Sequence, residues 1–394
     1  MAVSEKIRTS IENSSLIRRM FEAGNALKAT YGNDAVSDFS LGNPDVDPPE
    51  QVRKILAEIV AAPLPRKHGY MPNAGYTEVR EQVAAYVSTE QGVRLSRDQV
   101  VMSCGAGGAL NAALKTILNP GDEVIASVPC FMEYGFYADN HGGKLVLAPS
   151  APGFDLDVAA IEARIGPRTA ALLVNSPNNP TGRIYPEKTL RELSDMLLCA
   201  SRKHGRAIYI LSDEPYRKLA YDGAVVPSIL GLYPHSIVAT SYSKDLSLPG
   251  ERIGYIAVNP GADDAARLVD GIILCTRILG FVNAPALMQR LVGRLQGASV
   301  DVEIYRKKRD LFCDALTRMG YELTKPQGAF YLFPRAPGGD DAAFARALQD
   351  ERVLVVPGSG FSSPGWFRIA YCVDTAVIER SFSGFEKVAT RLRV

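Results

Sequence analysis

The chain is predicted to fold as an α/β protein with a mainly parallel sheet and a second, smaller domain. Its 394 residues exceed what a single hydrophobic core usually holds, so two domains are expected. From about residue 98, short apolar runs alternate with amphipathic segments, which is the pattern of βαβ units. Further strand-like runs near the end of the chain indicate a separate small sheet.

The apolar runs are short and rich in β-branched residues, so each is interpreted as a strand. The main sheet is expected to contain residues 99–102, 123–127, 144–148, 170–174, 207–211, 236–240 and 253–258. The small sheet is expected from residues 328–333, 354–358 and 367–371. Polar motifs follow most of the main strands, and open α/β sheets bind their ligands at the carboxyl ends of strands.

Helical periodicity is typical of the remaining long segments. It predicts helices over residues 5–30, 50–62 and 77–90. It also predicts one long helix over residues 286–319, which bridges from the main sheet to the small domain.

The composition argues against several classes of protein. Forty-four basic and 43 acidic residues leave a net charge of +1, without the basic runs typical of nucleic-acid or membrane binding. No apolar run is long enough to span a membrane, and the start does not resemble a signal peptide. The six cysteines lack metal-type spacing and are expected to be reduced thiols. These features predict small-molecule partners, no metal and a cytoplasmic location.

The stretch from residue 241 to 254 concentrates groups that suit an aldehyde cofactor with a phosphate. Lys244 follows an expected strand, and Arg252 lies eight residues later, beyond a Pro-Gly turn. The amine can form a Schiff base, while Ser241, Ser243 and Arg252 can hold the phosphate. Pyridoxal phosphate (PLP) fits this set. A solvated lysine and an arginine that caps a strand are the alternative.

A glycine-rich segment, Gly105-Ala106-Gly107-Gly108, precedes a helical run that starts at residue 109. Bare N–H groups at a helix N-terminus suit a phosphate, although a tight turn needs the same glycines. The segment does not match the GxGxxG pattern, because Leu110 occupies the last glycine position. A dinucleotide-binding fold is therefore disfavoured.

Three further polar residues interrupt apolar or turn-rich segments. Asn179 lies in a turn and has an amide that can donate to a phenolate oxygen of the cofactor. Asp213 ends an apolar strand, where a carboxylate can keep a pyridine nitrogen protonated, although a helix N-cap is the alternative. Arg368 interrupts an apolar strand and needs a carboxylate, either from a substrate or from an internal salt bridge.

Residues 241–254 resemble, position by position, the lysine-attachment signature of the class I/II aminotransferases, the fold-type I PLP enzymes. Asn179-Pro180-Thr181-Gly182 matches another signature of this family, and the motifs occur in family order. The resemblance implies a three-layer large domain over residues 47–285. It also implies a small α+β domain built from residues 1–46 and 286–394.

The resemblance implies PLP-dependent transamination from an L-amino acid to a 2-oxo acid such as 2-oxoglutarate, by a ping-pong mechanism. Lys244 holds the aldehyde and then moves a proton between the substrate α-carbon and C4′ of the cofactor. Each remaining site residue takes its role from the family. The cofactor is contacted by Gly105, Ala106, Gly107, Phe131, Asn179, Asp213, Tyr216, Ser241, Ser243 and Arg252, and the substrate by Gly42, Asn179 and Arg368.

The resemblance also implies a specific geometry for three residues. Phe131 stacks on the pyridine ring, and Tyr216 binds the same phenolate oxygen as Asn179. Tyr70, in a Tyr-x-Pro-x-x-Gly motif, reaches across a homodimer interface to the cofactor phosphate of the other subunit. Without the resemblance, Phe131 is an ordinary core residue and Tyr70 a loop aromatic packed on a neighbour.

The sequence leaves the substrate open. An aspartate-preferring branch of the family has a lysine where Gly107 aligns, and this chain lacks that partner for a side-chain carboxylate. Arg277 substitutes for it or is an ordinary surface residue. The donor is therefore acidic, neutral or aromatic. A C–S or β-elimination lyase of the same fold and a non-catalytic PLP-binding regulatory protein are the alternative functions.

Overall fold

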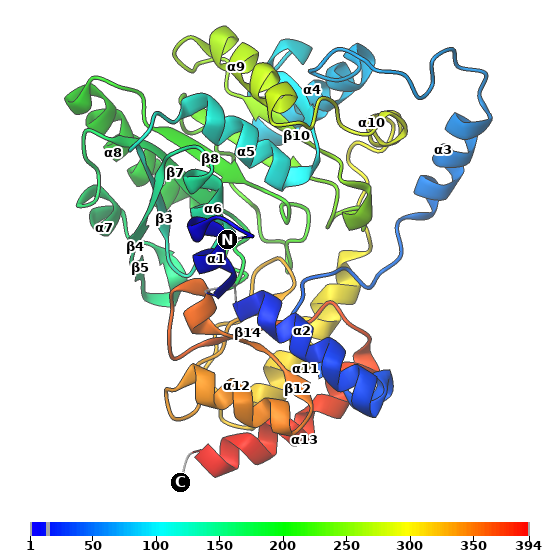
Figure 1. Ribbon diagram of the computed structural model, residues 1–394, viewed down its shortest axis with the longest axis vertical. Helices are drawn as coiled ribbons and strands as arrows, with labels where there is room; N and C mark the ends of the chain where they lie inside the picture. Colours follow the sequence, from blue (N-terminus) through cyan, green and yellow to red (C-terminus); the bar gives the residue numbers. More distant parts are fainter. Residues whose placement is uncertain (1, 13–15, 393–394) are drawn as a thin grey trace.

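The computed structural model describes residues 2–12 and 16–392, and a seven-stranded sheet dominates it (Figure 1). The strand order is β2-β10-β9-β8-β7-β3-β4; β10 pairs antiparallel with both β2 and β9, and the other pairs are parallel. All seven predicted strands are present, with ends shifted by at most two residues. They are β2 (Val100–Ser103), β3 (Glu123–Ser127), β4 (Lys144–Ala148), β7 (Thr169–Asn175), β8 (Tyr209–Asp213), β9 (Ser236–Ser241) and β10 (Gly254–Val258).

Helices cover both faces of this sheet because successive strand residues point to opposite sides. Val101 packs into the cluster with the helices of one face, whereas Val100 and Met102 pack into the cluster on the other. The first face carries α5 (Gly105–Ile117), α6 (Glu133–Asp139) and α9 (Ala265–Ile278). The second carries α4 (Thr77–Gln91), α7 (Val158–Glu162), α8 (Glu187–His204) and α10 (Ala286–Gly293). The predicted three-layer α/β class is confirmed.

A second group of elements combines segments from both ends of the chain. β1 (Ser37–Asp38) pairs in parallel with β12 (Val353–Leu354), more than 300 residues later. A three-stranded antiparallel sheet has the order β11-β14-β13, formed by β11 (Tyr331–Leu332), β14 (Phe367–Ala370) and β13 (Val356–Pro357). Three helices accompany it, namely α11 (Val302–Arg318), α12 (Asp341–Asp350) and α13 (Thr375–Leu392).

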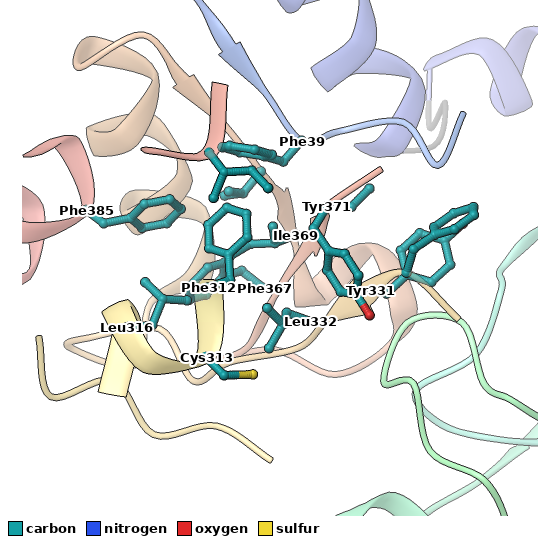
Figure 2. Close-up of a cluster of buried hydrophobic side chains, with 14 of the residues drawn as sticks. Phe39, Phe312, Cys313, Leu316, Tyr331, Leu332, Phe367, Ile369, Tyr371 and Phe385 are labelled. Carbon is teal, nitrogen blue, oxygen red and sulfur yellow. The ribbon is translucent and has the colours of Figure 1, made fainter. Parts of the chain in front are cut away.

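The core of this second group is aromatic (Figure 2). Phe39 packs edge-on against Phe312, with ring centroids 5.2 Å apart, and both belong to the cluster that contains Phe367 and Phe385. A residue from the first part of the chain is thus buried among residues that follow position 300. The domain limits at residues 46/47 and 285/286 stay predictions.

Several predicted boundaries need correction. The expected helix over residues 286–319 is two helices, because Gly297 has a φ of +84° and Asp301 caps α11 by accepting from the Glu303 N–H. The expected strand over 354–358 is divided between β12 and β13. Helices 50–62 and 77–90 correspond to α3 (Glu50–Ala61) and α4.

The N-terminal prediction of one helix over 5–30 corresponds to α1 (Glu5–Glu12) and α2 (Leu16–Tyr31). The part of that prediction at residues 13–15 lies outside the described residues. A short hairpin of β5 (Ser150–Ala151) and β6 (Asp155–Leu156) completes the strands. Among the described helices, none combines the length and apolar character that a bilayer crossing requires.

Candidate active site

A cavity of about 270 Å³ opens at the carboxyl ends of β7, β8 and β9. Segments of the second group, including β11 and β14, contribute to its wall. Most of the predicted site residues meet here although they are spread over more than 300 positions of the sequence. The cavity is lined by Gly42, Ala106, Gly107, Phe131, Asn179, Asp213, Tyr216, Ser241, Ser243, Lys244, Arg252 and Arg368.

Lys244 follows β9 and is partly buried in this cavity. Its Nζ donates a 2.7 Å hydrogen bond to the Gly42 carbonyl and lies 5.4 Å from the centroid of the Phe330 ring. Burial lowers the pKa of Lys244 to about 8, with smaller contributions from the cations Arg368 and Arg252. An amine with a pKa this close to neutrality is available both as a nucleophile and as a general base.

Asp213 ends β8 and presents one satisfied and one unsatisfied oxygen. Tyr134 donates to Oδ2 at 2.6 Å, whereas Oδ1 is buried without a hydrogen-bond partner among the described residues. Burial raises the pKa of Asp213 to about 7. A buried carboxylate oxygen is costly without a donor, and a protonated pyridine nitrogen is a donor with the matching charge. This atom fits the ring nitrogen of PLP.

Asp213 offers an acceptor, whereas a phosphate needs donors. Such donors are present around Arg252 and at the start of α5. The helix begins at Gly105, so the glycine segment forms its first turn, and the predicted start at residue 109 was wrong. The N–H groups of Ala106 and Gly107 therefore belong to the helix N-terminus, which favours anions. A Cβ on Gly105 would lie 2.7 Å from Arg252 Nη2, and the φ of Gly105 is +71°. Only glycine lets the guanidinium approach this closely.

Arg368 is 2% exposed and takes part in none of the ion pairs that the described residues form. Its Nη1 donates to Asn179 Oδ1 at 3.1 Å, its Nη2 donates to the Ser40 carbonyl at 2.6 Å, and its Nε has no partner within the described part of the chain. No described residue therefore forms the internal salt bridge that the sequence left open. A buried cation without an anion is strongly disfavoured unless a ligand supplies the charge.

The contact with Arg368 also orients Asn179. Because a guanidinium only donates, Asn179 must present its oxygen to it. Its Nδ2 group then remains to donate elsewhere. This orientation agrees with the predicted donation from Asn179 to the phenolate oxygen of the cofactor.

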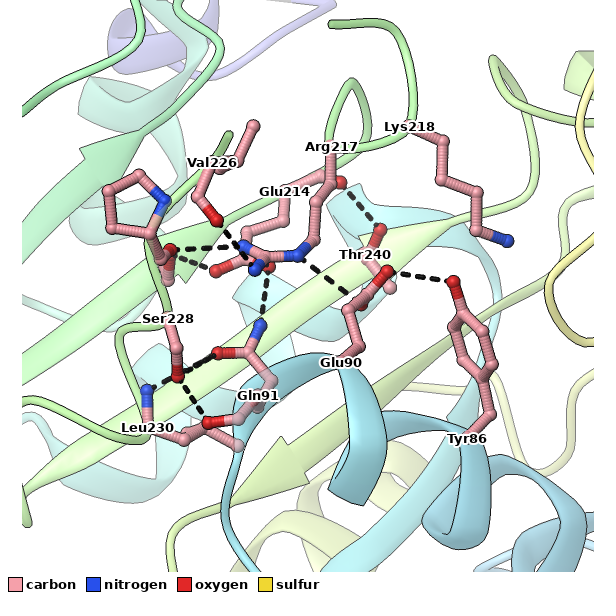
Figure 3. Close-up of polar contacts among 12 residues, drawn as sticks. Tyr86, Glu90, Gln91, Glu214, Arg217, Lys218, Val226, Ser228, Leu230 and Thr240 are labelled. Carbon is pink, nitrogen blue, oxygen red and sulfur yellow. Dashed lines mark hydrogen bonds and ion pairs between the residues drawn. The ribbon is translucent and has the colours of Figure 1, made fainter. Parts of the chain in front are cut away.

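A buried network of charged and polar side chains holds Glu214, the residue that follows β8 (Figure 3). Glu214 accepts from Ser212 at 2.7 Å, from Gln91 at 3.0 Å and from Arg217 at 3.2 Å. Arg217 also pairs with Glu90 of α4 at 3.3 Å. Since Glu214 directly follows Asp213, these bonds tie the site carboxylate to a helix on the second face of the sheet.

Four polar residues of the cavity wall were not assigned a role by sequence reasoning: Tyr134, Tyr137, Asn175 and Tyr331. Asn175 donates to the Asp213 carbonyl at 2.8 Å and pairs with Asp213 in the sheet. Its position at the end of a predicted strand was a signal that could have been used. The tyrosines carried no such signal, because tyrosine occurs both in cores and at surfaces and its presence in a helix or strand does not by itself indicate a site.

Besides Gly105, which lies behind the wall against Arg252, two residues considered from the sequence lie outside the cavity wall. Tyr70 is 91% exposed, and Arg277 is exposed near the C-terminal end of α9. Neither touches the cavity of its own chain. A role for either of them requires a second subunit.

The fold and the residues that line the cavity fit an enzyme that acts through an aldehyde cofactor with a phosphate. The aminotransferase class I and II family model matches residues 34–383, and the chain belongs to this family of PLP-dependent transferases. It is 35% identical to a probable aspartate/prephenate aminotransferase of Thermus aquaticus, over 90% of this chain and 91% of that protein.

Two other comparisons extend over nearly the full length. The chain is 29% identical to aromatic-amino-acid aminotransferase 2 of Thermococcus litoralis, over 98% of each protein. The crystal structure of an aminotransferase from Eubacterium rectale superposes with a TM-score of 0.96, at 39% identity and with full coverage of both chains. The predicted family, fold type and enzyme class are confirmed.

Proposed function

We propose that this aminotransferase moves the amino group of an L-amino acid to a 2-oxo acid such as 2-oxoglutarate, in two half-reactions of a ping-pong cycle. The observation that carries the proposal is that Arg368 is buried in the same cavity as Lys244 and Asp213 and that none of the described residues forms an ion pair with it. A substrate α-carboxylate supplies the missing anion through the planar fork of the guanidinium. Both the amino acid and the 2-oxo acid carry that group.

Each part of PLP has a proposed partner among the residues of the cavity. Ser241, Ser243, Arg252 and the N-terminus of α5 hold the phosphate, and Asp213 Oδ1 accepts from the ring nitrogen. Phe131 stacks on the ring, and Asn179 and Tyr216 donate to the phenolate oxygen. When bound, PLP supplies an aldehyde carbon and a protonated ring that accepts electrons from the substrate α-carbon.

Lys244 then acts on the substrate. Its Nζ, with a pKa near 8, removes the proton from the α-carbon of the amino acid and returns a proton during the reverse half-reaction. The Gly42 carbonyl positions this amine by accepting its hydrogen bond. Gly42 also lines the cavity in which the substrate is proposed to bind. The carboxylate bound by Arg368 fixes the α-carbon, and such positioning contributes up to about 7–11 kcal/mol in the best intramolecular cases.

The substrate range follows from the relatives and from the charges of the cavity. Relatives are named for aspartate, prephenate and aromatic amino acids, so the donors to test are aspartate, tyrosine, phenylalanine and a neutral control such as alanine. Within one chain, Gly107 brings no cation toward a side-chain carboxylate. Recognition of an acidic donor therefore needs Arg277 of a partner subunit or another cation.

We also propose a homodimer in which Tyr70 reaches the cofactor phosphate of the partner. The support is the resemblance of its Tyr-x-Pro-x-x-Gly motif to the family, together with an exposure of 91%, which leaves the side chain accessible to a second chain. The large domain over residues 47–285, the small domain from both chain ends, and the cytoplasmic location are retained as proposals.

The test is a half-reaction followed by absorbance. Adding an amino acid to the PLP-loaded protein should convert the bound cofactor stoichiometrically to its amino form, and 2-oxoglutarate should restore the original spectrum. An elimination lyase would instead release ammonia and a 2-oxo acid from a β-substituted donor with no acceptor present. No spectral change with any amino acid would contradict the proposal.

A further inference from the structure

Tyr331 is a buried side chain that touches three residues of the proposed site. It lies on β11, whose register places it opposite Ala370 of β14. Arg368 is two residues from Ala370 and therefore points to the same face, as a diagonal neighbour of Tyr331. The Arg368 guanidinium accordingly lies 4.7 Å from the centroid of the Tyr331 ring.

The Tyr331 hydroxyl meets the Tyr216 hydroxyl at 2.8 Å, and both side chains are buried. Two hydroxyl groups carry two protons, and the bond between them uses one. Burial raises the pKa of Tyr331 to about 12 against the opposing effect of the Arg368 cation, and burial raises the pKa of Tyr216 well above its ordinary value. Both hydroxyls therefore stay protonated near neutral pH, and either could donate in this bond. Because the proposed function uses the single Tyr216 proton for the phenolate oxygen, Tyr331 must be the donor to Tyr216. The Tyr216 proton then remains free to point into the cavity.

The third contact is with the backbone that holds Lys244. A Cβ on Gly42 would collide with the Tyr331 hydroxyl, so the chain at Gly42 is packed directly on this group. The Gly42 carbonyl in turn accepts from Lys244 Nζ at 2.7 Å. One side chain therefore touches the carboxylate-binding arginine, the phenolate-binding tyrosine and the support of the catalytic lysine.

We propose that Tyr331 is a positioning residue whose ring fixes Arg368 for the substrate carboxylate and whose hydroxyl directs the Tyr216 proton toward the cofactor. The inference rests on the proposed function, because it takes the roles of Arg368 and Tyr216 from it. Tyr331 couples the two ends of the site although it belongs to the small sheet and Tyr216 follows a strand of the main sheet.

Tyr331→Phe separates the two roles, because it removes the hydroxyl and keeps the ring. The readout is the pH midpoint of the cofactor absorbance change in the PLP-loaded protein. A proton donated to an anionic oxygen favours the deprotonated form, so a weaker donation from Tyr216 raises the midpoint. The expected rise is roughly 0.1–0.7 pH units, because a neighbour strengthens a charge-assisted hydrogen bond by about 10–30%. The KM for the amino donor should stay within about twofold.

Tyr331→Leu tests the ring, and it should raise the KM roughly 3–30-fold because the desolvated cation–π contact is lost. The matched control is Tyr321→Phe, which removes a buried hydroxyl that donates to the Phe385 carbonyl at 2.9 Å, outside the cavity wall. It should leave the absorbance midpoint unchanged.

A Tyr331→Phe midpoint equal to wild type, or an equal shift in Tyr321→Phe, would overturn the inference. The Phe variant is the more conservative of the two, so the inference can be refuted even when the Leu variant does not fold. A wild-type protein without a pH-sensitive cofactor band would contradict the proposed function itself, and the two failures are thus distinguishable.

Discussion

Replacing Arg368 by methionine should separate substrate binding from stability. In the ligand-free protein, the guanidinium is buried and has no anion among the described residues, and such a charge costs several kcal/mol. Its removal leaves the Ser40 carbonyl and Asn179 Oδ1 without a donor, which costs about 1–3 kcal/mol for each acceptor. The two effects oppose each other, so the free energy of unfolding should stay within about 2 kcal/mol of the wild type.

The effect on turnover should be much larger. A carboxylate held by two charge-assisted bonds gains about 1.5–3 kcal/mol from each, or about 3–6 kcal/mol in total. Arg368→Met should therefore lower kcat/KM for the amino donor by about 10²- to 10⁴-fold. Arg368→Lys keeps the charge but loses the planar fork, and an intermediate loss is expected.

The assay compares kcat/KM with the thermal midpoint of the cofactor-free protein. A control is Arg309→Met, because Arg309 is equally buried but pairs with Asp222 and Asp310. This control should lower the thermal midpoint and leave kcat/KM per folded molecule close to wild type. If Arg368→Met keeps kcat/KM within tenfold of wild type, then Arg368 does not hold the substrate carboxylate.

Three other predictions concern the residues of the cofactor site. Gly105→Ala should weaken PLP binding by displacing the Arg252 guanidinium, as measured by cofactor titration; unchanged affinity would contradict the phosphate site. Tyr134→Phe removes a hydrogen bond that lowers the pKa of Asp213, so that pKa should rise. When the pH is lowered, the variant should therefore lose affinity for PLP at a higher pH than the wild type does. Because burial raises the pKa of Asp213 to about 7, the folded cofactor-free protein binds the extra proton, and its stability should fall as pH rises from about 4 to 7 and then level off. In Asp213→Asn, the free energy of unfolding should no longer fall across this pH range, and the decrease that is lost is at most on the order of 4 kcal/mol. Thermal midpoints measured from about pH 4 to 7 check this, and an equal decrease in both proteins would contradict the assignment of the titration to Asp213.

The strand ends and their motifs could be predicted because each depends on local sequence. An apolar run followed by a polar residue predicts that Asp213 and Lys244 lie at the carboxyl ends of their strands, and this prediction needs no knowledge of contacts with distant segments. The break between α10 and α11 was also local, since Gly297 and Asp301 are typical stop and start signals that the periodicity argument overlooked.

The remaining features depend on contacts between distant segments. Whether Arg368 had an internal acidic partner could be decided only once its neighbours, including Asn179 far earlier in the chain, were known. Tyr331 reaches the site because of the register between β11 and β14, which no local pattern specifies. The orphan oxygen of Asp213 is likewise a property of packing, because it depends on which donors fail to reach it.

The central claim is that PLP is bound covalently through the amine of Lys244, and borohydride reduction tests it most directly. Reduction of the PLP-loaded protein, followed by digestion and mass spectrometry, should find the added cofactor mass on the peptide that contains Lys244. Its attachment to a different lysine, or its absence from every peptide of a protein that retains the absorbance band, would contradict the account.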